Sequence, residues 1–504
     1  MAAVIALLDM DCFYVQVEQR LEPSTRGLPA VVVQYNTYKG GGVIAVNYEA
    51  RAAGVNRFMR GDEAKSHCSQ LHVFHVPEQR GKADLTRYRQ ASEEVLDVIC
   101  KFNDQVIVER ASIDEAFIDL TKLVSSQRDN LPAFEQINTT YLPSATICGK
   151  GYGCCLKHFY EHVCVDEFGE HADDNKHLLI AAKIISDLRQ QIFEKTGFQC
   201  TAGISHSKML SKLSCSLRKP NGQTMLPHAC IHSLLLNTPI NKVRNLGGKF
   251  GEEVKSKLGV TSLGQITSFT YAQLSTHFSS KTAKWLYSLA RGFDGEEVIS
   301  RQIPKSIGCS KNFPVSQKNA LKTKDQVVYW MQQLSEEVIE RLKKDLDANR
   351  RMAKLITVGM RFANGEMISR SLPLQNYDTQ SVVDDIVKHI IVRVMSSSTE
   401  PIIMLSLSAS KFADAIYEDK CSKIDKFFIK NKNLKVSEMI GKAETNKTTR
   451  ETEEISSANN SISFHSSNSN TSKPNLEERR GFFYRKTLEL AAKRAKIETN
   501  SSKN

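Results

Sequence analysis

The sequence predicts a multidomain protein of the α+β class. Its 504 residues exceed the usual length of a single domain, and a hydrophobic content of 41% is sufficient to build packed cores. Short β-rich runs alternate with segments of helical periodicity as far as about residue 415, after which the composition changes. Together, these observations exclude a fibrous or wholly disordered chain.

The expected strands are short apolar runs bounded by turn residues. They are Val4–Leu8, Ala30–Val33 and Val43–Val46, followed by a hairpin of Val106–Val108 with Ala116–Leu120. The first run leads directly into Asp9, without the basic start or cleavage site of a signal peptide, so we interpret it as a strand. Gly40–Gly42 predicts a tight turn, because no Gly-Lys-Ser/Thr follows as a phosphate-binding loop requires.

Helices are predicted mainly in the second and third quarters of the chain. His177–Glu194 carries apolar residues at helical spacing, and residues 326–346 form a long amphipathic pattern. Residues 237–258 predict two short helices joined by the sequence Leu-Gly-Gly-Lys-Phe-Gly at 246–251. Further strands are expected around Lys354–Phe362 and Ile402–Ser408.

The net charge of +12 is distributed unevenly along the chain. Residues 1–225 carry 25 basic and 27 acidic side chains, residues 226–415 carry 25 and 17, and residues 416–504 carry 18 and 12. A polyanionic partner is therefore expected at the middle of the chain. Residues 416–504 are predicted to be a disordered tail, because Ser456–Ser472 consists almost entirely of Ser and Asn.

Two other classes of protein are disfavoured by the composition. No apolar stretch approaches the roughly 20 residues that a membrane-spanning helix needs, so we expect no membrane association. The 12 cysteines follow no regular disulfide framework, which is typical of reduced thiols in the cytosol or nucleus.

Acidic residues stand at two unusual places. Asp9 and Asp11 follow the first apolar strand, and the adjacent Asp114 and Glu115 lie between the strands of the hairpin. For either motif alone, a surface turn is an equally good interpretation. If the two strands are neighbours in one sheet, three carboxylates converge, and such a cluster needs divalent cations to compensate its charge. Two Mg²⁺ ions about 4 Å apart are the apparatus of phosphoryl or nucleotidyl transfer.

Five blocks of sequence together resemble the Y-family DNA polymerases, which carry out translesion synthesis. They are LLDMDCFYVQVEQR at 7–20, GGGVIAVNYEARAAGV at 40–55, ERASIDEAFIDL at 109–120, TAGISHSKMLSKLSCSLRKPNGQT at 201–224 and KSIGCSKNFP at 305–314. The resemblance covers about residues 1–415. It implies low-fidelity, template-directed DNA synthesis without proofreading past damaged bases such as UV pyrimidine dimers.

The resemblance also implies a right-hand polymerase architecture. The palm would comprise residues 1–12 and 85–225, and the fingers residues 13–84. The thumb, with a helix–hairpin–helix, would comprise residues 226–300. A linker at 301–305 would lead to a little finger at 306–415, followed by the tail at 416–504. The implied partners are primer–template DNA and deoxynucleoside triphosphates.

Site residues are carried over from the family position by position. Asp9, Asp114 and Glu115, with the backbone carbonyl of Met10, correspond to ligands of two Mg²⁺ ions, for which Mn²⁺ is a possible substitute; Asp11 corresponds to no ligand. The triphosphate-binding positions are the backbone amides of Cys12, Phe13 and Tyr14 and the side chains of Tyr48, Arg51, Arg57 and Lys219. Tyr14 would exclude a ribose 2′-OH, and Gln34 and Ile44 would line the template pocket. Gly247, Gly248, Lys249 and Gly251 would meet the DNA backbone. Phe58 stands where a small residue is expected, which leaves the range of lesions open.

Short motifs predict partners of the tail. Ile424, Phe427 and Phe428 resemble a sliding-clamp motif, although Cys421 replaces the usual Gln. The Phe427-Phe428 and Phe482-Phe483 pairs would alternatively bind a translesion scaffold protein. Arg479-Arg480 and the basic run at 493–496 resemble a bipartite nuclear-import signal, which predicts a nuclear protein. The tail contains no ubiquitin-binding zinc-finger pattern.

Two alternatives and one ambiguous segment remain. Another palm-type enzyme, such as a nucleotidyl cyclase, also pairs strand-end carboxylates with Mg²⁺, but it needs no basic middle region. A non-catalytic DNA-binding scaffold has no need of the three carboxylates. The Cys- and His-rich residues 148–171 fit no zinc-finger spacing, so we favour a family-variable insertion there over a zinc site.

Overall fold

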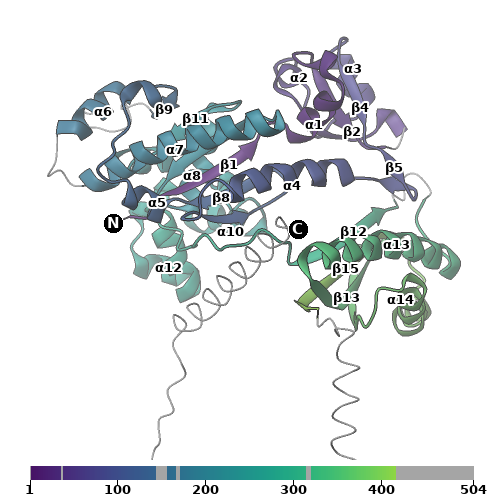
Figure 1. The fold of residues 1–504 in the computed structure, drawn as a ribbon. Helices are drawn as coiled ribbons and strands as arrows, with labels where there is room; N and C mark the ends of the chain where they lie inside the picture. Colours follow the sequence, from purple (N-terminus) through teal and green to yellow (C-terminus); the bar gives the residue numbers. More distant parts are fainter. Residues whose placement is uncertain (1, 36–37, 144–155, 166–170, 314–318, 416–504) are drawn as a thin grey trace, which may run out of the picture. The chain divides into compact units, whose positions relative to one another are not determined.

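The computed structural model describes residues 2–35, 38–143, 156–165, 171–313 and 319–415, all within one compact unit (Figure 1). They form a mixed α/β structure with several sheets, in agreement with the predicted fold class. The tail and its residues Ile424, Phe427 and Phe428 lie outside the described residues. Over the described ranges, no helix has both the length and the apolar character needed to cross a membrane.

A six-stranded sheet forms the centre of the first half of the chain. Its order is β7 (Ile107–Arg110), β8 (Glu115–Asp119), β1 (Ile5–Met10), β10 (Cys200–Ser205), β11 (Gln223–Met225) and β9 (Thr140–Tyr141). Strand β1 runs antiparallel to both of its neighbours, β8 and β10. The predicted first strand and the β7–β8 hairpin are confirmed, and the two are neighbours in one sheet.

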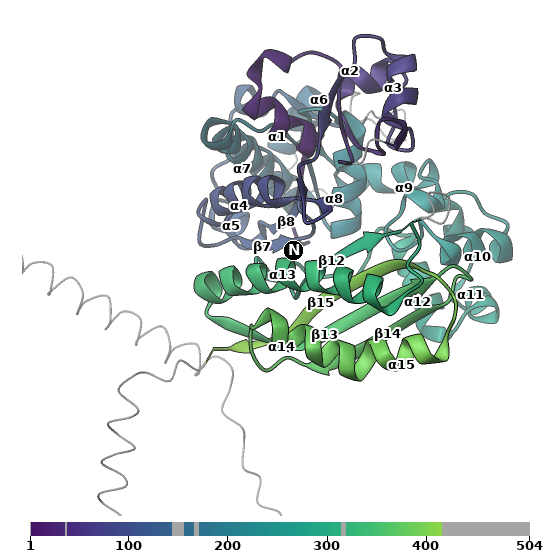
Figure 2. The same ribbon diagram turned by 90° about the vertical axis from the view of Figure 1, so that its right-hand side faces the viewer.

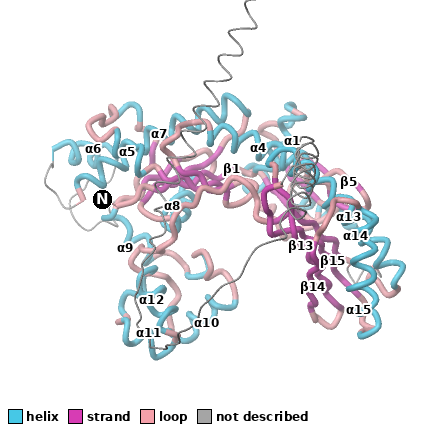
Figure 3. Tube along the Cα trace, turned by 60° about the horizontal axis from the view of Figure 1, so that its bottom comes forward, coloured by secondary structure: helices cyan, strands magenta, loops and turns pink. Residues whose placement is uncertain are grey.

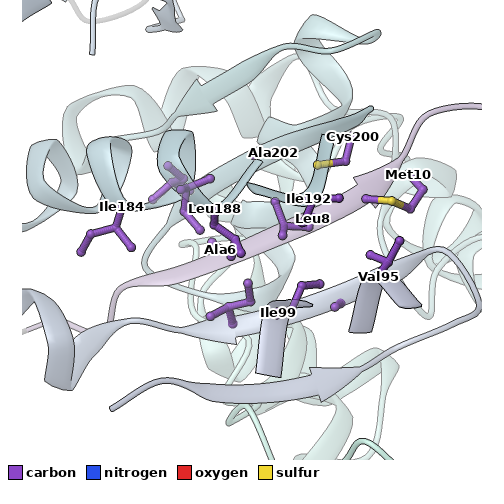
Figure 4. Packing of buried hydrophobic residues seen from close by; sticks show 14 of the residues in the cluster. Ala6, Leu8, Met10, Val95, Ile99, Ile184, Leu188, Ile192, Cys200 and Ala202 are labelled. Carbon is purple, nitrogen blue, oxygen red and sulfur yellow. The ribbon is translucent and has the colours of Figure 1, made fainter. Parts of the chain in front are cut away.

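The two faces of this sheet are covered by different helices. Ala6, Leu8 and Met10 of β1 point to the face that packs against α4 (Thr86–Cys100) and α7 (Ala172–Thr196), as Figure 4 shows. The alternate residues Ile5 and Leu7 pack with Cys215, the last residue of α8 (Lys208–Cys215). Because both faces are buried, β1 is apolar throughout until Asp9, and its end is the first place where the strand carries charge.

A smaller sheet follows β1 in the chain. Its order is β3 (Val43–Val46), β2 (Ala30–Val33) and β4 (His72–His75), and the two predicted strands have the expected bounds. The helices of this region are α1 (Phe13–Leu21), α2 (Tyr48–Ala52) and α3 (Gly61–His67). The predicted glycine turn is confirmed, since Gly40 and Gly41 have φ angles of 72° and 77°, which favour glycine.

Residues 228–289 are helical and have their own core. The helices are α9 (His228–Leu236), α10 (Lys249–Leu258), α11 (Tyr271–His277) and α12 (Ser280–Leu289) (Figure 3). The prediction of two short helices within 237–258 is wrong for the first, which is a single 3₁₀ turn at Ile240–Lys242. Pro239 precedes that turn and Gly247-Gly248 follows it closely, so too few helix-forming residues remain for an α-helix.

The last described region is a sheet covered by helices. Its antiparallel order is β12 (Ser306–Asn312), β15 (Ile402–Asp414), β13 (Arg351–Phe362) and β14 (Met367–Pro373). Helices α13 (Lys324–Asn349), α14 (Thr379–Ile386) and α15 (Val392–Ser397) pack with it in one hydrophobic core (Figure 2). The predicted long helix and both predicted strands are confirmed.

A buried ion pair lies where the chain passes from the helical region to this last sheet. Glu109 of β7 accepts a hydrogen bond from Lys208 at 2.5 Å and pairs with Arg301 at 3.0 Å. Burial alone would raise the pKa of Glu109, but the backbone N–H of Ile299 and the two cations together hold it below its ordinary value. Glu109 is therefore ionised and ties residues 299–301 to the central sheet.

Candidate active site

The pairing of β1 with β8 brings the predicted carboxylates together. Asp9 lies directly opposite Glu115 in the antiparallel register, so their side chains project on the same face of the sheet. The backbone N–H of Met10 donates to the carbonyl of Asp114 at 2.8 Å, which places the turn beside the end of β1. The convergence that the sequence predicted only on condition that the strands were neighbours is thus present.

Two lysines neutralise this cluster. Lys219 Nζ lies 2.5 Å from Asp9 Oδ1, and Lys212 Nζ donates to both oxygens of Glu115 at 2.6 and 2.8 Å. Burial raises the pKa of the Asp9 carboxyl to about 6; Lys219 opposes this rise, and nearby Glu115 and Asp114 add to it. Neighbouring carboxylates held partly out of water are stable as anions only with positive charge close by.

The donor set fits hard divalent cations. Asp9, Asp114 and Glu115 offer carboxylate oxygens, and Met10, the last residue of β1, offers its backbone carbonyl oxygen. Mg²⁺ and Mn²⁺ prefer oxygen ligands of this kind, and such a cation would replace the lysines as the compensating charge.

Asp11 has a different role from Asp9. Its side chain is 2% exposed and accepts hydrogen bonds from Thr201 Oγ1 at 2.8 and 2.9 Å, from the Asn221 N–H at 2.7 Å and from the Tyr48 hydroxyl at 3.0 Å. With these partners, Asp11 fixes the start of β10 and the turn that carries Lys219. This agrees with its assignment as a residue of the motif that is not a ligand.

The start of α1 presents backbone donors beside the carboxylates. Cys12 precedes the helix with a left-handed φ of 39°, and its side chain makes no capping hydrogen bond. The first N–H groups of a helix have no intrahelical acceptor and carry partial positive charge, so the amides around Phe13 and Tyr14 suit an anionic group.

Tyr14 is held in a fixed orientation. Its ring stacks on the ring of buried Tyr88 from α4, with centroids 4.1 Å apart and planes inclined by 15°. The Tyr88 hydroxyl in turn donates to buried Glu18, which also pairs with Arg87 at 2.7 Å. A flat ring supported in this way suits the predicted discrimination of the sugar.

Tyr48 and Arg51 share one face of α2, as their spacing predicts. The guanidinium of Arg51 lies 4.7 Å from the centre of the Tyr48 ring, and its Nε donates to the carbonyl of Val46 at 3.1 Å. Both residues belong to α2, the helix that directly follows β3. Arg57 is exposed, and its positive charge lowers the pKa of Tyr14, although burial raises that pKa overall.

The predicted template residues lie on neighbouring strands. The Gln34 N–H, just after β2, donates to the carbonyl of Gly42 at 2.9 Å, and Ile44 is a half-buried residue of β3 that packs against the main core. Phe58 is 99% exposed, so its ring extends into solvent and fills no pocket within the described residues.

The glycines of the predicted DNA-binding turn are of two kinds. A Cβ at Gly251 would lie 1.8 Å from the backbone oxygen of Leu246, so glycine is required there by close packing. A Cβ at Gly248 would meet no atom within 4 Å. Gly248 precedes α10 and has no side chain that could cap the helix. The first N–H groups of α10, including those of Lys249 and Gly251, therefore receive no side-chain cap and are available to an anion.

Two residues that contribute to the site, Lys212 and Thr201, are not predicted from the sequence. Lys212 is one of several lysines in residues 201–224, and only the packing of α8 on the sheet shows that it reaches Glu115. Thr201 lies opposite Asp9 in the β1–β10 register and bonds Asp11 across 190 residues of sequence. No alternation along β10 singles out Thr201, because every residue of this strand is buried.

Carboxylates at strand ends, flanked by cations and by a helix N-terminus, define a class of sites that transfer phosphoryl or nucleotidyl groups. The family model described as "impB/mucB/samB family" matches residues 8–216, and the model of its C-terminal domain matches residues 304–420. A model described as "DNApol eta/Rev1, HhH motif" matches residues 238–293. The chain belongs to the Y family of translesion DNA polymerases.

Within this family, the sequence blocks are most similar to those of the eta polymerases, and the relatives agree. The chain is 44% identical over 360 residues to DNA polymerase eta of Arabidopsis thaliana, covering 71% of this chain and 52% of the relative. It is 39% identical over 400 residues to DNA polymerase eta of Drosophila melanogaster, covering 75% and 45%. DNA polymerase IV of Staphylococcus aureus (strain Newman) is 25% identical over 414 residues, covering 82% and 96%. The chain spans about half the length of the two eta polymerases.

Proposed function

We propose that the chain is a template-directed DNA polymerase that synthesises DNA across damaged bases, including UV pyrimidine dimers. The observation that carries this proposal is the pairing of Asp9 with Glu115 beside Asp114, at the end of the central strand of a family-matched sheet. The relatives named DNA polymerase eta support a translesion substrate.

In the proposed mechanism, Asp9, Asp114, Glu115 and the Met10 carbonyl would hold two Mg²⁺ ions. Ions so held would lower the pKa of the primer 3′-OH and stabilise the leaving phosphate oxygens. Lys219, Arg51 and Tyr48 then balance charge on the triphosphate, and the amides at the start of α1 receive its oxygens. Lys219 must leave Asp9 in this process, and its freed charge is available to the nucleotide.

The proposed division of the chain follows the sheets and helices. The central sheet would be the palm, and the β3–β2–β4 sheet with α1 to α3 the fingers. Residues 226–300 would be the thumb, whose Gly247-Gly248 turn, open at Gly248, contacts a DNA phosphate, and the β12–β15 sheet would be the little finger. The surplus of basic residues in 226–415 supports contact with the DNA backbone there.

The remaining parts of the proposal concern cell biology. A nuclear location and binding to a sliding clamp or a translesion scaffold rest on tail motifs in residues 416–504, outside the described structure. Low fidelity is expected, because selection would rest on the fit of the base pair in the Gln34–Ile44 pocket. A nucleotidyl cyclase is disfavoured by the match of residues 238–293 to a helix–hairpin–helix motif.

The test is primer extension with Mg²⁺ and deoxynucleoside triphosphates on an undamaged template and on one that carries a thymine dimer. We expect extension on both templates, and loss of extension in the double variant Asp114→Asn/Glu115→Gln. Asp119→Asn is the matched control, since Asp119 is the last residue of the same strand β8 and lies at the opposite end of the strand from Glu115. Extension that stops at the dimer would refute the lesion assignment, and extension that survives in the double variant would refute the mechanism.

A further inference from the structure

A second group of metal-ligating side chains lies away from the carboxylate site. His171 precedes α7, Asp174 lies in its first turn, and His228 is the first residue of α9. One ligand atom from each of the three lies within 4.8 Å of the others. The three residues are spread over 57 positions of the chain, so no sequence spacing announces them.

The separations within this group approach those of a coordination sphere. Asp174 Oδ2 lies 3.3 Å from His228 Nε2 and 3.7 Å from His171 Nδ1. In a tetrahedral zinc site with ligand bonds of about 2.0–2.1 Å, neighbouring ligand atoms are about 3.3 Å apart. Small rotations of the two imidazoles would therefore complete three corners of such a site.

A fourth imidazole stands next to the three. His206, the residue after β10, stacks on His228 with ring centres 4.0 Å apart, and His228 stacks on His171 at 4.1 Å. His206 Nδ1 contacts the Ala3 carbonyl at 3.0 Å. Its Nε2 is buried and has no hydrogen-bond partner among the described residues, so this nitrogen is available as a metal ligand beside the group.

One oxygen of Asp174 is held by the backbone of the chain's first residues. The Ala2 N–H donates to Asp174 Oδ1 at 3.0 Å, while Asp174 Oδ2 lies near both His171 Nδ1 and His228 Nε2. A carboxylate oriented by a backbone donor is the usual outer-shell arrangement of a metal ligand.

The exposure of the group also differs from that of a closed core cluster. The side chain of His171 is 41% exposed, while those of Asp174 and His228 are 14% and 19% exposed. An ion could thus enter past His171 and be held by the two less exposed ligands. An ordinary histidine–aspartate ion pair would need only one imidazole.

We propose that His171, Asp174 and His228 bind one zinc-class divalent cation, with His206 or water as the fourth ligand. Imidazole nitrogen with one carboxylate is a donor set for Zn²⁺ and similar transition ions, whereas Mg²⁺ prefers oxygen alone. The ion is structural: it joins the residues that precede β1, which contact Asp174 and His206 through Ala2 and Ala3, to α7 and α9. This site is independent of the proposed polymerase activity.

The test is a Zn²⁺ titration of the full chain, metal-stripped and carrying Asp114→Asn/Glu115→Gln, in excess Mg²⁺. These conditions suppress zinc binding at the catalytic carboxylates. Mass spectrometry of bound metal should find one zinc per chain, and zinc should raise the melting temperature. When His228→Ala or Asp174→Asn is introduced into this background, the apparent affinity for zinc should fall by at least about tenfold. His171→Ala should do the same, and it is the safer variant because its side chain is the most exposed of the three.

The matched control is His232→Ala, one turn farther along α9 and exposed, which should bind zinc as the unsubstituted background does. Co²⁺ in place of Zn²⁺ should give the weak visible bands of nitrogen and oxygen ligation. Absence of zinc binding, unchanged affinity in the His171 and Asp174 variants, or intense near-ultraviolet thiolate bands would each overturn the proposal.

Discussion

Substitution of Gly251 by alanine should destabilise the helical region of residues 228–289. The added Cβ would lie 1.8 Å from the Leu246 oxygen and 2.8 Å from its carbonyl carbon, whereas real Cβ contacts stay above 3.0 Å. The backbone must therefore separate by about 1.2 Å at a turn where both partners are main chain. Overpacking of this kind costs about 1–3 kcal/mol, and we expect the upper value because no side chain can rotate away. That corresponds to an increase of about 150-fold in local unfolding.

Hydrogen exchange measured by mass spectrometry is the appropriate assay, since a chain with several cores does not unfold in one step. Peptides from α10 to α12 should exchange faster in the Gly251→Ala variant, while peptides from β13 and β15 should be unchanged. The matched variant Gly248→Ala adds a Cβ in open space and should exchange like the unsubstituted protein.

The same pair separates packing from DNA contact. Gly248→Ala should weaken DNA binding by about fivefold if the open face of this turn meets a phosphate, without changing the salt dependence. Lys249→Ala should instead reduce the slope of log affinity against log salt by about 1. Unchanged exchange in Gly251→Ala would refute the packing argument, and unchanged DNA affinity in both of the other variants would refute the proposed contact.

Three further outcomes are expected elsewhere. Lys219→Ala should lower kcat/KM for nucleotide incorporation by about 10–100-fold, because a charge-assisted bond to the triphosphate is lost; an unchanged value in steady-state kinetics would exclude that contact. Tyr14→Ala should raise ribonucleotide incorporation by about 100-fold, measured as the ratio of kcat/KM for the two sugars, and an unaltered ratio would argue against the role of the ring stacked on Tyr88. Glu109→Gln should cost about 3–5 kcal/mol of stability near pH 7, since it leaves buried Lys208 unpaired. Because the pKa of Glu109 is depressed, its contribution to the free energy of unfolding is present above the ordinary pKa of 4.5 and fades as the pH falls below it. The difference in unfolding free energy between the unsubstituted chain and Glu109→Gln should therefore shrink at acidic pH. Denaturant melts in which this difference stays constant would contradict the assignment.

Local patterns were sufficient for much of the fold. Ala30–Val33 and Val43–Val46 were predicted with their observed bounds, because short β-branched runs between turns leave little choice. The helix at His177–Glu194 was predicted, but α7 begins at Ala172. Its first turn carries Asp173 and Asp174, which suit a helix start but have no apolar periodicity to detect.

The candidate site was predictable only as far as its own motifs. Asp9, Asp114 and Glu115 are visible as charges where strands should end, but their meeting depends on a pairing that no local pattern specifies. Lys212 lies 97 residues from Glu115 and Thr201 lies 190 residues from Asp11, and nearly every lysine or threonine has the same sequence context as these two. The same limit hid Asp174 and His228 from a search for zinc-finger spacings, because that search requires ligands that are close in sequence.

The proposed function depends above all on nucleotidyl transfer at the carboxylates that end β1 and begin β8. Its most direct measurement is the single-turnover rate of one nucleotide incorporation by Glu115→Gln, compared with the unsubstituted chain at saturating DNA and Mg²⁺. We expect a loss of about 10²–10³-fold with unchanged affinity for DNA, since only charge at the reacting phosphate is removed. A rate within about threefold of the unsubstituted chain would contradict it.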